Sequence, residues 1–191
     1  PLLIVLVALV LAGCATVPTS GPVVHHTAQA VGPTSGVEVE PLPPQAGASQ
    51  LLVVEGFLHA MSTYQPDYAI ARQYLTEAAS AEWQPTSGVQ VYAEGNFAEV
   101  GETVMLVAPV VGSLDQAGSY TAASDVAEAG QLKHDFGLVR DQNGQWRIAN
   151  PPPGLLVSRY VFTAGFTQVV LHYLAEGDDD VLVPDIRFFA S

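Results

Sequence analysis

The chain has 191 residues, of which 49% are hydrophobic and only 13% are charged. Nineteen acidic residues against six basic ones give a formal net charge of -13. A phosphate-binding surface needs clustered Lys and Arg, and the six bases form no cluster, so the composition argues against nucleic acid as a partner. Anionic lipid headgroups would also repel an acidic domain, so charge alone does not hold this chain on a membrane.

An apolar run opens the chain and ends at its only cysteine, Cys14. The run PLLIVLVALVLAG, residues 1–13, has no charged side chain. A transmembrane helix needs about 20 apolar residues, so this run is too short to span a bilayer. Its length and its small final residues fit the h-region of a secretory signal peptide. Because no Met and no charged segment precede it, we expect residues 1–13 to be an incomplete signal peptide.

Cys14 admits two interpretations. A free cysteine is often a small buried hydrophobe, but the residues that follow, ATVPTSGPVVHHTAQAVGPTSG, show no helical or strand period and offer no core. The sequence Leu11-Ala12-Gly13-Cys14 at the end of an h-region resembles the bacterial lipobox, in which the thiol receives diacylglycerol. Stable anchoring needs at least two acyl chains, and this modification supplies two. We therefore predict that Cys14 is lipidated and anchors the chain to the extracytoplasmic face of the cell membrane.

Residues 14–49 form a predicted Pro-rich tether. Proline removes backbone donors and favours extended geometry, so the segment holds the following domain away from the headgroups. His25 and His26 lie in it. Two adjacent histidines without further ligands are more typical of a solvated linker than of a metal site.

The pattern from residue 50 to residue 83 predicts three helices. In QLLVVEGFLHAMST one face is apolar, and Glu55 and His59 turn away from it. That face consists of Leu51, Val54, Phe57, Leu58 and Met61. Pro66 fits the first position of a second helix, whose apolar stripe is Tyr68, Ala71 and Leu75 with Tyr74 beside it. Thr76 fits the N-cap of a short third helix, EAASAEW.

From residue 89 the pattern changes to short β-rich segments separated by turns. The segments are VQVYAE, TVMLVAPVV, GSYTAAS, LKHDFGLV and QWRIAN, and two of the turns are DQAG and DQNG. FTQVVLHYLAEGDDDVLVPDIRFF predicts one more hairpin, around Gly177. Helices followed by antiparallel strands are typical of the α+β class. We predict helices packed on one face of a curved, cone-shaped antiparallel sheet.

The residues offer no convergent catalytic set. Glu55 and His59 are four apart on a helix and favour a solvated pair, whereas consecutive His134 and Asp135 on a strand point to opposite faces. Asp178-Asp179-Asp180 lacks the spaced ligands of a calcium loop. Trp83 and Trp146 are interpreted as core or sheet-face packing. We expect no catalytic residue, no cofactor and no metal, although the mouth of a cone-shaped sheet can hold an apolar pocket.

Several stretches together resemble the LpqB family of actinobacterial exported lipoproteins. They are LAGCATVPTSGPV, VVEGFLHAM, ARQYLTEAASAEWQP, VGSLDQAGSYTAA, GQWRIANPPPGLLVS and VVLHYLAEGDDDVLVPDIRFF. The resemblance implies an N-terminal domain similar to nuclear transport factor two-like folds, followed by a GerMN domain and a β-propeller. We accordingly assign residues 50–160 to the N-terminal α+β domain and residues 161–191 to the start of a truncated GerMN-like domain.

The resemblance also implies a role outside the cell. Members of this family accompany the sensor kinase MtrB and the regulator MtrA, so it implies an accessory that modulates the extracellular domain of the kinase in cell-envelope homeostasis. Of the family's functional residues, only the lipidated cysteine carries over, onto Cys14. Two other classes stay open: a binding module for an envelope ligand or glycan, and a cell-wall hydrolase. Two carboxylates about 5–9 Å apart in one cleft would favour the hydrolase.

Overall fold

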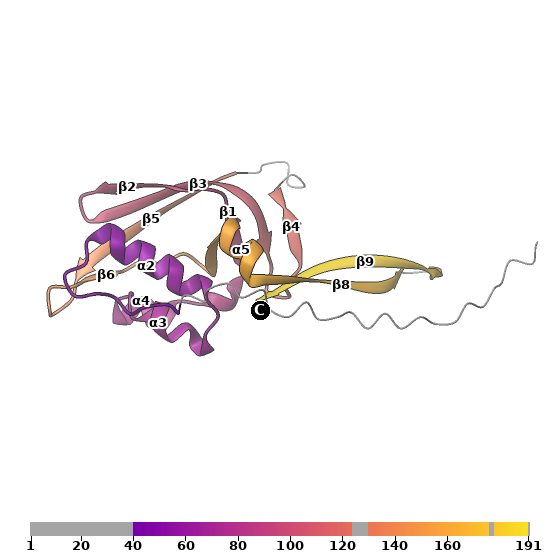
Figure 1. Ribbon diagram of the computed structural model, residues 1–191, viewed down its shortest axis with the longest axis horizontal. Helices are drawn as coiled ribbons and strands as arrows, with labels where there is room; N and C mark the ends of the chain where they lie inside the picture. The colour runs from indigo at the N-terminus through magenta and orange to yellow at the C-terminus, as the bar shows by residue number, and fades with distance from the viewer. Residues whose placement is uncertain (1–39, 124–129, 176–177, 191) are drawn as a thin grey trace, which may run out of the picture. The chain divides into compact units, whose positions relative to one another are not determined.

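The computed structural model of the chain describes residues 40–123, 130–175 and 178–190 (Figure 1). Its helical elements are α2 (Gln50–Ser62), η1 (Pro66–Tyr68), α3 (Ala69–Arg72), α4 (Glu77–Glu82), η2 (Pro85–Ser87) and α5 (Arg159–Gly165). Its strands are β1 (Val89–Tyr92), β2 (Asn96–Val100), β3 (Thr103–Leu114), β4 (Tyr120–Ala122), β5 (Gln131–Arg140), β6 (Trp146–Ile148), β7 (Leu155–Ser158), β8 (Phe166–Ala175) and β9 (Asp178–Ala190). Helices therefore precede a run of strands, and the predicted α+β class is confirmed.

Seven strands form one curled sheet in the order β6-β5-β3-β1-β7, with β2 and β4 also paired to β3. The DQNG turn joins β5 to β6 as an antiparallel hairpin, as predicted. The prediction of an antiparallel sheet is wrong for one pair, because β7 runs parallel to β1. The Pro-rich loop before β7 explains the difference. Trp83 Nε1 donates to the carbonyls of Pro152 and Gly154 at 3.1 and 3.2 Å, so the loop lies under the helices and brings β7 to the far side of β1.

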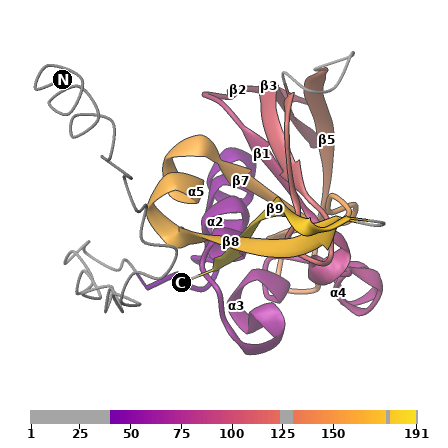
Figure 2. The ribbon, with the colours of Figure 1, turned by 90° about the vertical axis from the view of Figure 1, so that its right-hand side faces the viewer.

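The helix α2 provides one layer of the core, and Figure 2 shows it beside the sheet. Ser49 caps it, since its side chain accepts a hydrogen bond from the Leu52 amide at 3.3 Å. Its buried residues are Val53, Val54, Phe57, Leu58, Ala60 and Met61. Glu55 and His59 are exposed, as the sequence predicts. Leu51 was expected in this face and is only half-buried, because it lies in the first turn at the margin of the sheet.

The second predicted helix is broken near its start. Pro66 opens a 3-10 turn, and Asp67 and Tyr68 then take left-handed backbone conformations with φ of 57° and 51°. Non-glycine residues rarely adopt this conformation. The Tyr68 ring meets the Trp83 ring edge-on at a centroid distance of 5.9 Å. Tertiary packing of this ring has therefore overridden the local helical pattern. The third helix, α4, begins after Thr76 as predicted.

The centre of the core is aromatic. The Phe57 ring on α2 lies 5.4 Å from that of Trp83 and 6.4 Å from that of Phe136 on β5. All three side chains are almost fully buried. The inner face of β3 supplies the opposing layer with Val104, Leu106 and Ala108. Trp146 is half-buried at the edge strand β6, with the Arg140 guanidinium 4.2 Å from its ring centroid.

The hairpin β8–β9 forms a second, two-stranded sheet. Its base is attached to the first sheet by a cluster of four aromatic rings with neighbouring centroids 4.8–5.9 Å apart. They are Tyr120, Phe162, Phe166 and Phe188. The Phe188 amide also donates to the Gly118 carbonyl at 2.9 Å. The helix α5 spans residues 160 and 161, where the domain boundary is predicted. The boundary itself stays a prediction.

Candidate functional site

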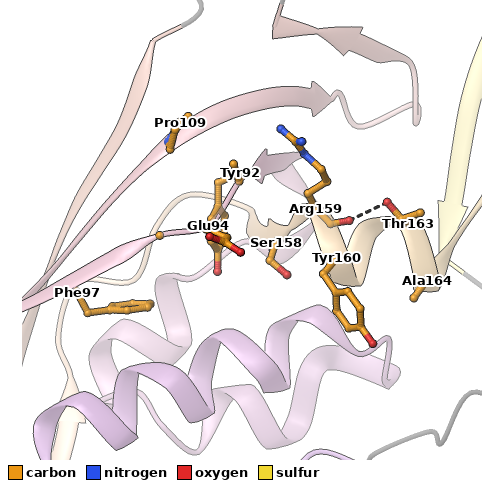
Figure 3. Close-up of a pocket in the computed structure, with 11 residues that line it drawn as sticks. Tyr92, Glu94, Phe97, Pro109, Ser158, Arg159, Tyr160, Thr163 and Ala164 are labelled. Atoms are coloured by element: carbon orange, nitrogen blue, oxygen red, sulfur yellow. Dashed lines mark hydrogen bonds between the residues drawn. The ribbon is translucent and has the colours of Figure 1, made fainter.

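A pocket of about 990 Å³ opens where β1, β2 and β7 approach α5 (Figure 3). One wall is formed by the end of β1, the connection to β2, Phe97 of β2 and Pro109 of β3. The other wall is formed by the end of β7 and by α5. The lining residues are Tyr92, Ala93, Glu94, Gly95, Phe97, Pro109, Ser158, Arg159, Tyr160, Thr163 and Ala164. A concavity of this volume is in the range of small-ligand and peptide side-chain sites.

The connection between β1 and β2 shapes the first wall. The Ala93 amide donates to the Pro109 carbonyl at 2.9 Å, which continues the pairing with β3 beyond β1. At Gly95 a Cβ atom would lie 2.6 Å from Cδ1 of the buried Leu106 side chain. A larger residue at this point would require the Leu106 side chain to shift. The close passage places Glu94 and Phe97 on the pocket wall, and Figure 3 shows both side chains beside the pocket.

The second wall depends on the start of α5. Ser158 ends β7 and caps the helix, since its hydroxyl accepts a hydrogen bond from the Val161 amide at 3.3 Å. Within the helix, the Thr163 hydroxyl donates to the Arg159 carbonyl at 2.8 Å (Figure 3). Tyr160 projects from the helix and is 84% exposed. The hydroxyls of Ser158 and Thr163 are therefore committed to the helix, and the side chain of Tyr160 is available to a ligand.

The lining of this pocket contains few ionisable side chains. Burial raises the pKa of the Tyr92 phenol, which keeps it neutral at physiological pH. Glu94 is the one carboxylate and Arg159 the one guanidinium among the described lining residues. The two carboxylates that a glycoside hydrolase places in one cleft are not among them. The pocket offers apolar walls and one charge of each sign.

A second exposed feature is the hairpin β8–β9. Eight large apolar side chains on it are 38–60% exposed. They are Val169, Val170, Tyr173, Leu174, Leu182, Val183, Ile186 and Phe189. The pairing of the strands places Val170, Leu174, Leu182 and Ile186 on one face of the hairpin and the other four on the opposite face, so both faces are partly apolar.

The predicted site residues are not brought together. Cys14, His25 and His26 lie outside the described residues, as do the side chains of residues 175–181, so the lipidation of Cys14 stays a prediction. Among the described residues no three His, Cys, Asp or Glu side chains gather as a metal site. In the same part of the chain no helix is long and apolar enough to cross a membrane.

His134 has a structural environment. Its ring packs edge-on against Phe136 at 4.5 Å between centroids, and its Nε2 lies 3.1 Å from the Asn150 carbonyl oxygen. Burial lowers the pKa of this imidazole, although the Asn150 carbonyl and the nearby Asp135 oppose the shift. Asp135 is exposed, and the two residues form no dyad, as the alternation of a strand predicts.

Sequence reasoning did not locate the pocket. Its walls come from segments more than 60 residues apart, VYAEGNF and SRYVFTA, and the pairing of β1 with β7 joins them. A signal was present in each segment. A glycine inside a strand pattern marks a bulge, and Ser158 before RYVFTAG is a possible N-cap. Neither signal predicts that the two segments meet.

Comparison with known proteins identifies the family. The model of the domain described as "Lipoprotein LpqB, N-terminal domain" matches residues 43–163, more than half of the chain. The chain belongs to the LpqB lipoprotein family. The resemblance seen in the sequence is thereby confirmed.

Its relatives are actinobacterial lipoproteins. The chain is 40% identical over 186 residues to Lipoprotein LpqB of Cutibacterium acnes, covering 96% of this chain and 30% of that protein. It is 33% identical over 196 residues to the Thermobifida fusca protein of the same name, and the match covers 95% of this chain and 30% of that protein. The Mycobacterium tuberculosis protein of that name is 31% identical over 188 residues, and the match again covers 95% of this chain and 30% of that protein. The chain thus spans about 30% of the length of these relatives. No solved structure matches it.

Proposed function

We propose that the chain is part of a lipid-anchored lipoprotein on the extracytoplasmic face of the cell membrane, where it modulates a sensor kinase of the MtrB type. Its relatives are named lipoproteins, and Cys14 ends a sequence that resembles a lipobox. The family resemblance supplies the kinase as partner and cell-envelope homeostasis as the process. In this proposal the chain acts by binding and carries out no reaction.

The observation that carries the proposal is the exposed apolar surface of β8–β9. A lone two-stranded hairpin is marginal in water unless another element covers it. Here the base is fixed by the aromatic cluster around Phe162, while side chains such as Tyr173 and Val183 remain about half exposed. Such a surface favours association with a further layer, which either another part of a chain as long as its relatives or a partner protein can supply. A sensor domain on the same membrane face is a partner that the anchor would bring within reach.

A pull-down with the extracellular domain of the kinase tests the partner. The full chain should retain this domain, and Tyr173→Asp combined with Val183→Asp should weaken retention, because the two residues pair across the hairpin and are exposed. Val139→Asp is the matched control, since Val139 is 43% exposed on β5 of the other sheet. If neither the chain nor any variant retains the kinase domain, the proposal is refuted.

The anchor is tested separately. Cys14→Ser should move the protein from the membrane fraction to the soluble fraction, or leave the signal peptide uncleaved, because the thiol is the proposed site of acylation. A mutant that is processed and still remains with membranes after a carbonate wash would contradict lipid anchoring at this residue.

Two further proposals concern the domain itself. We infer that α2 on the curled sheet forms a cone of the nuclear transport factor two-like kind, a type that often has a pocket at its mouth. The second candidate function, an envelope ligand- or glycan-binding module, is favoured by the 990 Å³ pocket, which combines the Tyr92, Phe97 and Tyr160 rings with Glu94. Binding of cell-wall glycan fragments, measured by calorimetry and lost in Tyr160→Ala, would support it.

A further inference from the structure

We propose that the free edge of β2, together with the adjoining pocket, binds an extended peptide segment that carries one apolar side chain next to a Lys or Arg. The peptide would add to the sheet as a strand beside β2 and insert its apolar side chain between Phe97 and Tyr160. The inference rests on the proposed function in that the segment is taken to belong to the extracellular part of the sensor kinase. Strand addition of this kind is a recurrent mode of peptide recognition.

The edge is available because β7 stops short of it. The β7 strand lies parallel to β1, and its last paired residue, Ser158, stands opposite Tyr92. Ser158 then caps α5, and the helix turns the chain away from the sheet. The line of β1 nevertheless continues through residues 93–95 into β2, which pairs with β3 alone. The position beside β2 that a longer β7 would fill is therefore not taken by any described strand (Figure 2).

The register shows which backbone groups face this position. The Leu138 amide donates to the Glu102 carbonyl at 2.8 Å. The backbone N–H and C=O groups of the even-numbered residues at the start of β3 therefore point toward β5. Thr103 and Met105 consequently bond to β2, where their partners are Val100 and Ala98. In an antiparallel ladder the intervening residues point the other way. The intervening residues of β2, 97 and 99, thus present their N–H and C=O groups to the free edge.

The pocket lies against the start of this edge. Phe97 belongs to the β2 strand and also lines the pocket with its half-buried ring. A strand beside β2 would place every second side chain on the same sheet face as Phe97. One of these side chains would then enter the space between Phe97 and the exposed Tyr160 of α5 (Figure 3). Buried aromatic contacts of this kind dominate the affinity of peptide interfaces.

The net charge of -13 favours a basic peptide and disfavours a second copy of the chain, and the basic side chain has to lie on the Glu94 wall because Arg159 lines the opposite wall. Glu94 is exposed, lines the pocket and forms no ion pair with another described residue. Pairing of two β2 edges would bring two copies of Glu94 together, and the chain carries a net charge of -13. Like charges brought face to face are destabilising. A Lys or Arg in the peptide would instead offset Glu94.

Amide hydrogen exchange at residue resolution tests the strand. The probe is a panel of overlapping 12-residue peptides from the extracellular domain of the kinase, together with that whole domain, added to the full chain carrying Cys14→Ser. Binding should slow exchange at the amides of Phe97 and Glu99, and should leave Ala98 and Val100 unchanged because they already bond to β3. N-methylation of alternate peptide residues should abolish binding in one register and preserve it in the other.

Two exposed side chains test the pocket without disturbing the core. Tyr160→Ala should weaken peptide binding roughly 5- to 30-fold, as expected for an aromatic anchor. Tyr64→Ala is its control, because Tyr64 is 68% exposed and lies outside this pocket. Glu94→Gln should weaken binding roughly 2- to 5-fold and reduce its salt dependence.

The possible results separate the two proposals. If the kinase domain binds and the amides of Phe97 and Glu99 exchange as fast as before, strand addition is overturned and the proposed function stands. If a peptide binds but Tyr160→Ala and Tyr64→Ala have equal effects, the pocket is not its side-chain site and the inference is also overturned. If neither the domain nor any peptide binds the chain, both proposals fail.

Discussion

The two sheets of this chain are both rich in large apolar residues, and they use them differently. In the first sheet, α2 supplies a second layer, and residues such as Phe57, Leu106 and Phe136 are fully buried. In β8–β9 no described element covers the strands beyond their base, and Leu182 is 60% exposed. Apolar side chains need a second layer to become a core. The comparison therefore places the core in the first sheet and shows that, within the described part of the chain, the apolar side chains of β8–β9 have no second layer.

The largest expected effect separates two phenylalanines, one from each region. Phe57→Ala should lower the free energy of unfolding by about 3–5 kcal/mol, because Phe57 is fully buried and packs against Trp83 and Phe136. Phe189→Ala should change it by less than about 1 kcal/mol, since Phe189 is 50% exposed on β9. Urea denaturation of the two variants measures the difference. Similar losses for both would mean that the hairpin is as much a part of the cooperative core as α2.

A smaller effect is expected at Gly56, which lies within α2. Alanine normally favours a helix by about 1 kcal/mol over glycine, but a Cβ here would lie 2.5 Å from the Tyr74 hydroxyl oxygen. That hydroxyl donates to the Leu42 carbonyl at 2.8 Å, so it is held in place. Overpacking typically costs about 1–3 kcal/mol, and Gly56→Ala should therefore destabilise the chain on balance.

The control for this substitution is Gly165→Ala at the end of α5. A Cβ at Gly165 would meet no atom within 4 Å. This substitution should be neutral or slightly stabilising in the same denaturation experiment. If the Gly56→Ala variant has the same free energy of unfolding as the Gly165→Ala variant, the Tyr74 side chain moves easily and the packing of α2 is loose.

Local patterns in the sequence predicted most of the elements of the first sheet. The 3.6-residue period identified α2 and its buried face, Thr76 identified the start of α4, and the DQNG turn identified the β5–β6 hairpin. Each of these depends on residues close together in the chain. The parallel pairing of β7 with β1 was missed, because nothing local specifies which edge a strand joins after a long connection.

The candidate site shows the same limit more strongly. The pocket exists because the β1–β7 pairing brings together Glu94 and Tyr160, which are 66 positions apart in the sequence and both line it. Its lining has no spaced motif, only aromatic, small and singly charged residues. Such residues have ordinary structural explanations when read singly. The sequence predicted that a pocket at the mouth of the sheet was possible, and it contained no information on which residues would line it.

The aromatic cluster that joins the two regions should have a local effect rather than a global one. Phe188→Ala removes the ring that contacts both Tyr120 and Phe162, so the hairpin should separate more readily from the first sheet. Amide exchange in β8 and β9 should accelerate, whereas exchange in α2 should not change. Phe189→Ala, at the next position, is the control. Unchanged exchange throughout the hairpin would show that the other contacts at its base are sufficient.

The smallest expected effect is a pH dependence that belongs to the first sheet. His134 is half-buried beside Phe136, and burial lowers the pKa of its imidazole below the ordinary value of 6.5. Between pH 6.5 and the lower pKa of the folded state, the unfolded chain binds a proton that the folded chain does not. Stability should therefore fall as the pH is lowered through this range.

Urea denaturation at pH 8 and pH 5 measures this dependence. His134→Gln should reduce the loss of stability at pH 5, because the amide does not titrate and can still donate to the Asn150 carbonyl, which His134 Nε2 contacts at 3.1 Å. Asp141 contributes separately to the pH dependence of stability. Hydrogen bonds from the Gln145 and Asn143 amides and the charge of Arg147 hold the pKa of its carboxyl below 3.8. Its protonation therefore lowers stability only at a pH below the range in which His134 acts. His172→Gln on the exposed face of β8 is the matched control. If it reduces the loss as much as His134→Gln does, the pH dependence does not arise from burial in the first sheet.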